Sequence, residues 1–204
     1  MTNIDYAALT KALEKNEFQA QVFETGEECV KFLLETLKPE DEIGMGGSKT
    51  IEQTGLYDQL VNAGYTVHWH WRAPKENWRE VKDAARQSEN YICSANAISM
   101  DGKLVNMDGA SNRVSAMVFG PRDVYILIGK NKICPDLEAA RRRIFDVVSP
   151  KIAVMVNYNT PCKKTGKCYD CAMPDRCCRV EVIIHKKPRD VNMHILLIKE
   201  DFGF

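Results

Sequence analysis

Hydrophobic residues recur at helical spacing in some segments of the chain and form short strand-like runs in others. The helical spacing predicts helices over Tyr6–Leu13, Glu27–Leu37, Ile51–Ala63, Lys75–Gln87 and Asp136–Val148. Strands are predicted over Gln19–Phe23, Glu42–Met45, Tyr65–Trp71, Tyr91–Ile98, Asp123–Ile128, Arg179–His185 and His194–Lys199. Because helices and strands alternate, the sequence predicts an α/β fold whose mainly parallel sheet is flanked by helices. Neither a repeat nor a linker interrupts the pattern, so we expect one domain over residues 1–204.

A turn rich in small residues, Gly44-Met-Gly-Gly-Ser-Lys-Thr50, joins a predicted strand to a predicted helix. The backbone N–H groups of such a turn can converge on an anion at the helix N-terminus, where the helix dipole also favours negative charge. We therefore predict an anion site, with the ligand-binding residues Gly44, Gly46, Gly47, Ser48 and Thr50. The alternative is a tight structural turn in which Ser48 or Thr50 caps the helix.

Two nucleotide-binding motifs are not met by this turn. The P-loop requires glycine where Ser48 precedes Lys49, and the dinucleotide fingerprint requires glycine where Lys49 stands. The chain therefore carries no ATP or NAD motif here. Glu52 follows in the first turn of the predicted helix and is a candidate general acid or base, although a glutamate at that position also suits the helix dipole.

A polar stretch from Ser94 to Arg113 follows another predicted strand. Parallel α/β sheets place ligand sites at the C-terminal ends of their strands, and this stretch mixes carboxylates with basic and amide groups. Lys132 follows the strand Asp123–Ile128 in the same way. The candidate catalytic residues are Asp101, Asp108, Lys132 and Glu52. The candidate ligand-binding residues in the stretch are Asn96, Asn106, Asn112 and Arg113.

A surface hairpin is the alternative interpretation of this stretch. Two Asp-Gly pairs, at 101–102 and 108–109, are turn signals that flank Lys103–Met107. In that interpretation, the polar residues belong to the turns and take no part in chemistry.

Five of the eight cysteines fall within one short segment, which we expect to be a loop over residues 157–179 inserted between late elements. The candidate metal ligands are Cys162, Cys168, Cys171, Cys177 and Cys178. A local cluster in a chain with enough hydrophobic residues for a full core favours metal or redox chemistry over a disulfide scaffold. An iron-sulfur cluster and a Zn site both stay open, as do a redox pair of thiols and inert cysteines. The scattered Cys29, Cys93 and Cys134 are expected in the core.

The overall composition narrows the classes of partner. The chain has 204 residues, 28 basic and 28 acidic side chains and a formal net charge of zero, which gives no overall field to attract nucleic acid or an anionic membrane. Its apolar runs fall short of the roughly 20 residues that span a bilayer, and its N-terminus has no apolar segment after a basic start. We therefore expect a cytoplasmic protein without nucleic-acid or membrane partners.

Four motifs resemble those of the LUD-domain family, which is named for lactate utilisation. They are GMGGSKT at 44–50, SANAISMDGKLVNMDGASNRVSAMVFGP at 94–121, IGKNKICPDLEAARRRI at 128–144 and TPCKKTGKCYDCAMPDRCC at 160–178. The resemblance implies the fold shared by ribose-5-phosphate isomerase, glucosamine-phosphate deaminase and CoA transferases, in which the turn at Gly44–Thr50 is similar to a phosphate-binding turn. The segment Ala97–Asn106 is similar to the motif that methylthioribose-phosphate isomerase and translation-factor relatives place over a ligand.

The resemblance also implies a role in lactate or related organic-acid utilisation, with an anionic small-molecule substrate and an iron-sulfur partner protein. Two alternatives stay open beside it: a sugar-phosphate isomerase with a structural metal site, and a non-catalytic ligand-binding subunit of a redox complex. Whether the protein forms a homo-oligomer, and whether it is an enzyme, are also left open by the sequence.

Overall fold

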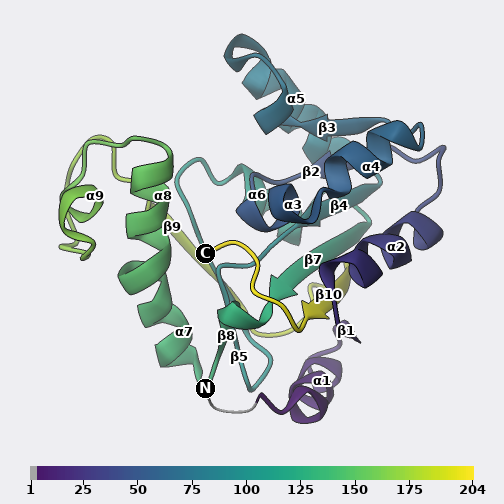
Figure 1. Cartoon of the computed structure of the whole chain (residues 1–204), viewed down its shortest axis with the longest axis horizontal. Coiled ribbons are helices and arrows are strands. Elements are labelled where there is room, and N and C mark those ends of the chain that lie inside the picture. Colours follow the sequence, from purple (N-terminus) through teal and green to yellow (C-terminus); the bar gives the residue numbers. More distant parts are fainter. Residues whose placement is uncertain (1–3) are drawn as a thin grey trace.

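A computed structural model describes residues 4–204, and its centre is a six-stranded, fully parallel sheet (Figure 1). The order of its strands is β1-β10-β7-β4-β2-β3. Their bounds are Gln19–Phe23 for β1, Ile43–Met45 for β2, Val67–Trp69 for β3, Asn90–Cys93 for β4, Asp123–Gly129 for β7 and Asn192–Ile198 for β10. The inner strands β4 and β7 are buried almost throughout, as their uninterrupted apolar sequences require of strands covered on both faces.

Helices cover both faces of this sheet and create two hydrophobic cores. On one face, α1 (Tyr6–Lys15), α5 (Trp78–Gln87) and α6 (Asn112–Val118) pack against sheet residues such as Ile126 and Ile195. On the other face, α2 (Gly26–Thr36), α3 (Lys49–Thr54) and α4 (Leu56–Asn62) pack against Leu127 and Leu196. Because neighbouring strand residues point to opposite faces, one apolar run supplies both cores. The predicted α/β class with a mostly parallel sheet is confirmed.

A second, smaller sheet stands beside the first. Its order is β8-β5-β6-β9, with bounds Ile133–Cys134, Ala97–Ser99, Leu104–Asp108 and Val180–Ile184. A third core forms where α7 (Leu137–Arg143) packs on this sheet. From α7 the chain continues through a π-helical turn (Ile144–Val148) into α8 (Ser149–Met155), and Figure 1 shows the three as one column of helix.

Several local predictions differ from the structure. The predicted strand Tyr91–Ile98 is two strands, β4 and β5, which belong to different sheets. The predicted helix Ile51–Ala63 is divided at Gly55, which has a φ of 68° and precedes a new helix. The predicted strand Tyr65–Trp71 leaves the extended conformation at His70, where a 3-10 turn (His70–Arg72) begins. The predicted hairpin is present as β5 and β6, but both strands are largely buried. The Asp-Gly pair at 101–102 therefore lies at the turn of a hairpin whose strands belong to the core.

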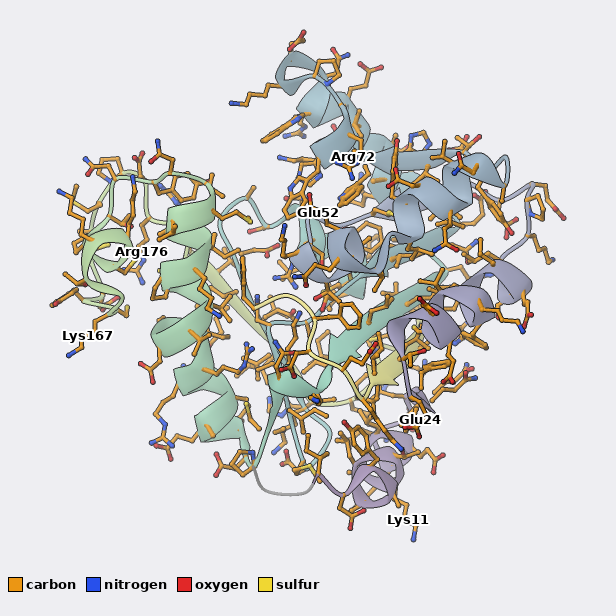
Figure 2. All side chains as sticks on the ribbon, viewed as in Figure 1. Lys11, Glu24, Glu52, Arg72, Lys167 and Arg176 are labelled. Carbon is orange, nitrogen blue, oxygen red and sulfur yellow. The ribbon has the colours of Figure 1, made fainter. Side chains whose placement is uncertain are left out.

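The cysteine segment lies outside both sheets. It contains the short helix α9 (Pro161–Thr165) and leads into β9. Figure 2 shows Lys167 and Arg176 of this segment beyond α8, on the far side from the large sheet. The buried Cys29, Cys93 and Cys134 occupy core positions, as predicted. Within residues 4–204, no helix has the length and apolar character needed to cross a bilayer.

Gly44 lies where β2 meets α5, and the closeness of that contact gives a test of the packing. A Cβ at position 44 would stand 2.0 Å from the carbonyl oxygen of Ala85, which is backbone and cannot rotate away. We expect Gly44→Ala to lower the free energy of unfolding by about 3 kcal/mol or more, at the upper end of overpacking costs. Urea denaturation followed by circular dichroism measures the change.

Gly55→Ala is the matched control, because Gly55 has open space around its Cβ position and only a positive φ to accommodate. Its expected cost is about 1 kcal/mol. Equal losses in the two variants would contradict the packing role of Gly44.

Candidate functional site

The C-terminal ends of β2, β4 and β7 open onto one cleft. Residues of the three loops that follow these strands line its inner part, which has a volume of about 50 Å³. An outer part of about 190 Å³ adjoins it and extends to Asp108 and Tyr158. Gly47, Asn96 and Arg113 contribute to both parts, and the helix column supplies an apolar wall. The site therefore lies where parallel sheets place their ligands.

Lys132 lies at the inner end of this cleft and is almost completely buried. Its Nζ donates hydrogen bonds to Thr50 Oγ1 at 2.6 Å and to Ser94 Oγ at 2.8 Å. Burial, and then the positive charges of Arg143 and Arg113, hold the pKa of the Lys132 ammonium well below its ordinary value. Three loops that are distant in sequence thus meet at one amine.

Arg113 occupies the middle of the cleft wall and binds the surrounding backbone and side chains. One terminal nitrogen donates to Ser94 O at 2.8 Å and to Asn106 Oδ1 at 2.6 Å. The other donates to Asn96 Oδ1, to Met107 O and to Asp108 Oδ1, the last at 2.7 Å. The Asp108 carboxylate also accepts from the backbone N–H of Val114 at 3.1 Å. Arg113 therefore holds the cleft together through bonds within the protein.

Asn106 lies behind this network. Its Oδ1 accepts a hydrogen bond from Arg113. Its Nδ2 is buried and has no hydrogen-bond partner among residues 4–204. The residue is fully buried and does not contribute to the walls of the cleft. Its contact with Arg113 makes it a positioning residue in this arrangement.

The C-terminal segment covers the inner end of the cleft. In Figure 1 it leaves β10, in yellow, and ends between α3 and α8. Gly203 N donates to Gln53 Oε1 of α3 at 2.6 Å, and the Lys151 ammonium of α8 lies 5.6 Å from the ring centroid of Phe204. A Cβ at Gly203 would stand 2.5 Å from Thr50 Oγ1 and 3.1 Å from Lys132 Nζ. Only glycine allows the segment to approach this closely with its φ of 68°.

The cleft brings together seven of the predicted catalytic and ligand-binding residues. These are Gly47, Ser48, Thr50, Asn96, Asp108, Arg113 and Lys132. Ser48 is also the cap of α3, since its Oγ accepts from Ile51 N at 3.4 Å, so the structural alternative for this turn describes that side chain correctly. The two interpretations of the turn are therefore compatible.

The other predicted residues lie outside the walls of the cleft. Asp101 is at the far end of the β5–β6 hairpin, where its carboxylate pairs with Lys103 Nζ at 2.6 Å. Asn112 faces a separate hollow next to α5, and Glu52 of α3 (labelled in Figure 2) pairs with Lys49. Gly46 packs against Tyr91, and Gly44 packs against α5. These positions follow from strand lengths and packing, which local sequence does not specify.

Four groups of residues at the site were not predicted from the sequence: Lys49, Ser94, the C-terminal segment and Arg143. Ser94 contacts Lys132, the C-terminal segment covers it, and Arg143 of α7 is turned inward. Arg143 belongs to a run of three arginines that is typical of an exposed helix face, yet its side chain donates to Asn131 O, Asn96 O and Phe204 O. Arg143 lies at helical spacing from the buried Ala140 and Ile144, and this spacing is the sequence feature that indicates an inward-facing side chain.

The cysteine segment touches the outer part of the cleft. Cys177 lines it together with Asp108 and Arg113. Burial, and then the nearby Cys178, Cys162 and Cys171, raise the pKa of the Cys177 thiol to about 11. Cys178, Cys162 and Cys171 are therefore within electrostatic range of Cys177. No three His, Cys, Asp or Glu side chains in the described part of the chain are gathered in an arrangement that would hold a metal ion, so the metal stays a prediction.

The parallel sheet, the Gly-rich turn and the cleft at the strand ends define an α/β protein with a cleft at the position where such folds place ligand sites. The chain belongs to the LUD-domain family, whose profile matches residues 6–198, and this family is associated with lactate utilisation. A solved DUF162 family protein from Deinococcus radiodurans has a TM-score of 0.55 and 8% identity to this chain, with 95% of each chain covered, and so has the same fold. The structure of eIF2B beta from Chaetomium thermophilum has a TM-score of 0.39 and 18% identity, over 55% of this chain and 44% of that one. None of the curated proteins matches the sequence.

The Asp108–Arg113 ion pair gives a test of how the cleft is held. Asp108→Ala would leave the Arg113 guanidinium buried without its counter-charge, and we expect a loss of about 3–5 kcal/mol in the free energy of unfolding. Glu138→Ala removes an ion pair to Arg142 whose side chains are 80% and 65% exposed, and its expected cost is under about 1 kcal/mol. Denaturant titration of both variants measures the difference, and similar losses would refute the role given to Asp108.

Proposed function

We propose that the cleft binds a small organic-acid anion and that the protein acts in the utilisation of lactate or related organic acids. The observation that carries the proposal is the charge of the inner part of the cleft. Its walls include the basic side chains of Lys49 and Arg113 and the buried amine of Lys132, while the carboxylates that pair with the first two, Glu52 and Asp108, do not line it. Basic donors presented into a part of a cleft that no acidic side chain lines favour a negative ligand.

Further support comes from hydrogen-bond donors at the same place. Lys49 and Thr50 begin α3, and the first N–H groups of a helix have no partner within it. These donors, together with the Lys49 ammonium, fit a carboxylate or a phosphate. The membership of the LUD-domain family favours the carboxylate.

We also propose the more specific assignment of the fold, to the group that contains ribose-5-phosphate isomerase and the CoA transferases. The Gly-rich turn that directly follows the parallel strand β2 and leads into α3 supports this assignment. The sugar-phosphate isomerase function is an alternative that the same site would serve, because its donors also suit a phosphate group.

Calorimetric titration tests the anion site. We expect lactate and pyruvate to bind, and their uncharged amides not to bind, because each charge-assisted hydrogen bond contributes about 1.5–3 kcal/mol. Lys49→Gln removes one cation from the inner wall and should weaken binding about 10-fold or more. The matched control is Lys167→Gln, which changes the same charge at a position of the cysteine segment that lies beyond α8 and lines neither part of the cleft, and it should leave binding unchanged.

The outcomes separate the hypotheses. Equal binding of the acids and their amides would refute the proposal. Tighter binding and isomerisation of a sugar phosphate would favour the isomerase. Binding of the acids without turnover, even when an electron acceptor and an iron-sulfur partner protein are supplied, would favour the ligand-binding subunit of a redox complex.

We propose further that the cysteine segment holds an iron-sulfur cluster or Zn. Four thiolates suit either group, and the proximity of Cys177 to Cys162, Cys171 and Cys178 supports the fit of the donor set. A cluster would supply electron transfer beside the cleft, whereas Zn would stabilise the segment. Cys177, one of the residues that would hold the metal or cluster, lines the outer part of the cleft and so connects that group to the site.

Metal analysis after anaerobic purification tests the segment. We expect iron with acid-labile sulfide, or zinc, in the wild-type protein, and loss of that metal in Cys171→Ser. Cys134→Ala removes a core thiol and should keep the metal. The same metal content in all three proteins, or metal in none, would remove the metal site from the proposal.

A further inference from the structure

Lys132 is a buried amine without a partner of opposite charge. Only 4% of the residue is exposed, and no carboxylate among residues 4–204 forms an ion pair with it. Buried lysines ordinarily require a partner, since an isolated ammonium is costly to remove from water. The charged neighbours that act on it most strongly are Arg143 and Arg113, which are themselves positive.

The hydrogen bonds around Lys132 show how many protons its nitrogen donates. The Ser94 hydroxyl donates its proton to Leu127 O at 2.5 Å, and the Thr50 hydroxyl donates its proton to Phe202 O at 3.3 Å. Because each hydroxyl has a single proton, both must accept from Lys132 Nζ. Two N–H donors satisfy this arrangement, and a neutral amine has two protons.

A neutral amine fills this arrangement, whereas the third N–H of an ammonium would have no acceptor within residues 4–204 at the remaining position on the nitrogen. Burial and the two arginines disfavour the third proton that would occupy it. Lys132 also lines the inner part of the cleft, next to the donors proposed to bind a carboxylate. An unprotonated amine in a dry pocket is the form in which lysine attacks a carbonyl group.

We propose that Lys132 forms an imine with the carbonyl carbon of a small 2-oxo acid bound in the cleft. This inference rests on the proposed function, because the carboxylate of the 2-oxo acid occupies the proposed anion site. It defines the substrate class more narrowly: the acid has a carbonyl group next to its carboxylate.

The step is balanced without any further reactant. The Nζ lone pair forms a bond to the carbonyl carbon, and the π electrons of the C=O bond move to its oxygen, which takes a proton from the nitrogen. The resulting carbinolamine loses its hydroxyl group together with the second amine proton as water, and a C=N bond remains. The hydroxyls of Thr50 and Ser94, both in contact with Nζ, are placed to pass these protons.

Reductive trapping tests the proposal on the intact protein. The protein is incubated with pyruvate and sodium cyanoborohydride at pH 7, and the reduced adduct is located by mass spectrometry of its peptides. Since each unit by which a lysine pKa falls raises its neutral fraction about tenfold, we expect Lys132 to be labelled at least about tenfold faster than Lys130. Lys130 is the matched reference because it lies in the same turn and is partly exposed.

Two variants complete the experiment. Lys132→Met should lose the adduct and Lys130→Arg should keep it. If Lys132→Met does not fold, the position of the adduct in the wild-type peptides decides the question alone. Labelling of Lys132 no faster than Lys130, in a protein that binds pyruvate by calorimetry, would overturn the imine and leave the anion site standing. Absence of pyruvate binding would overturn both.

Discussion

The buried guanidinium of Arg113 is the interaction on which the cleft depends. It binds the loop after β4, through Ser94 and Asn96, to the end of β6, through Asn106 and Met107. The first loop belongs to the large sheet and β6 belongs to the small one. Taking a guanidinium out of water is costly unless its donors are satisfied, and here backbone carbonyls, two amides and the Asp108 carboxylate satisfy them. Arg113 therefore connects the loop after β4 to β6 of the small sheet at the cleft.

A second consequence of this arrangement is electrostatic. Asp108 pairs with Arg113 on the outer side and Glu52 pairs with Lys49, so the acids near the cleft are engaged and no aspartate or glutamate among residues 4–204 lines its inner end. That imbalance accounts for both functional proposals. It presents basic groups to a negative ligand, and it leaves the Lys132 ammonium without a partner of opposite charge, which lowers the pKa of that ammonium. The C-terminal segment strengthens the effect, since it covers Thr50 and Lys132 and excludes water from them.

The Gly-rich turn shows which features of the site a local sequence pattern predicts and which it does not. The pattern strand–turn–helix at 44–50 is present, and Gly47, Ser48 and Thr50 do line the cleft. Gly44 and Gly46 belong to the same pattern, but they are glycines for a different reason. α5 packs so closely against Gly44, and Tyr91 against Gly46, that a side chain would not fit. Glycine meets both requirements equally well, so a single sequence cannot distinguish a ligand-binding glycine from a packing glycine.

The sequence by itself determined the fold class, the alternation of helices and strands, and the loops that carry the site. These depend on hydrophobic periodicity and turn chemistry, which are properties of neighbouring residues. Only the tertiary structure decided that Lys132 meets Thr50 and Ser94, 82 and 38 positions away, and that Arg143 turns inward from a run of arginines. It also decided that Asp101, on the β5–β6 hairpin, stands apart from Asp108. The physical reason is that strand order and register, set by packing over the whole chain, choose which loops become neighbours.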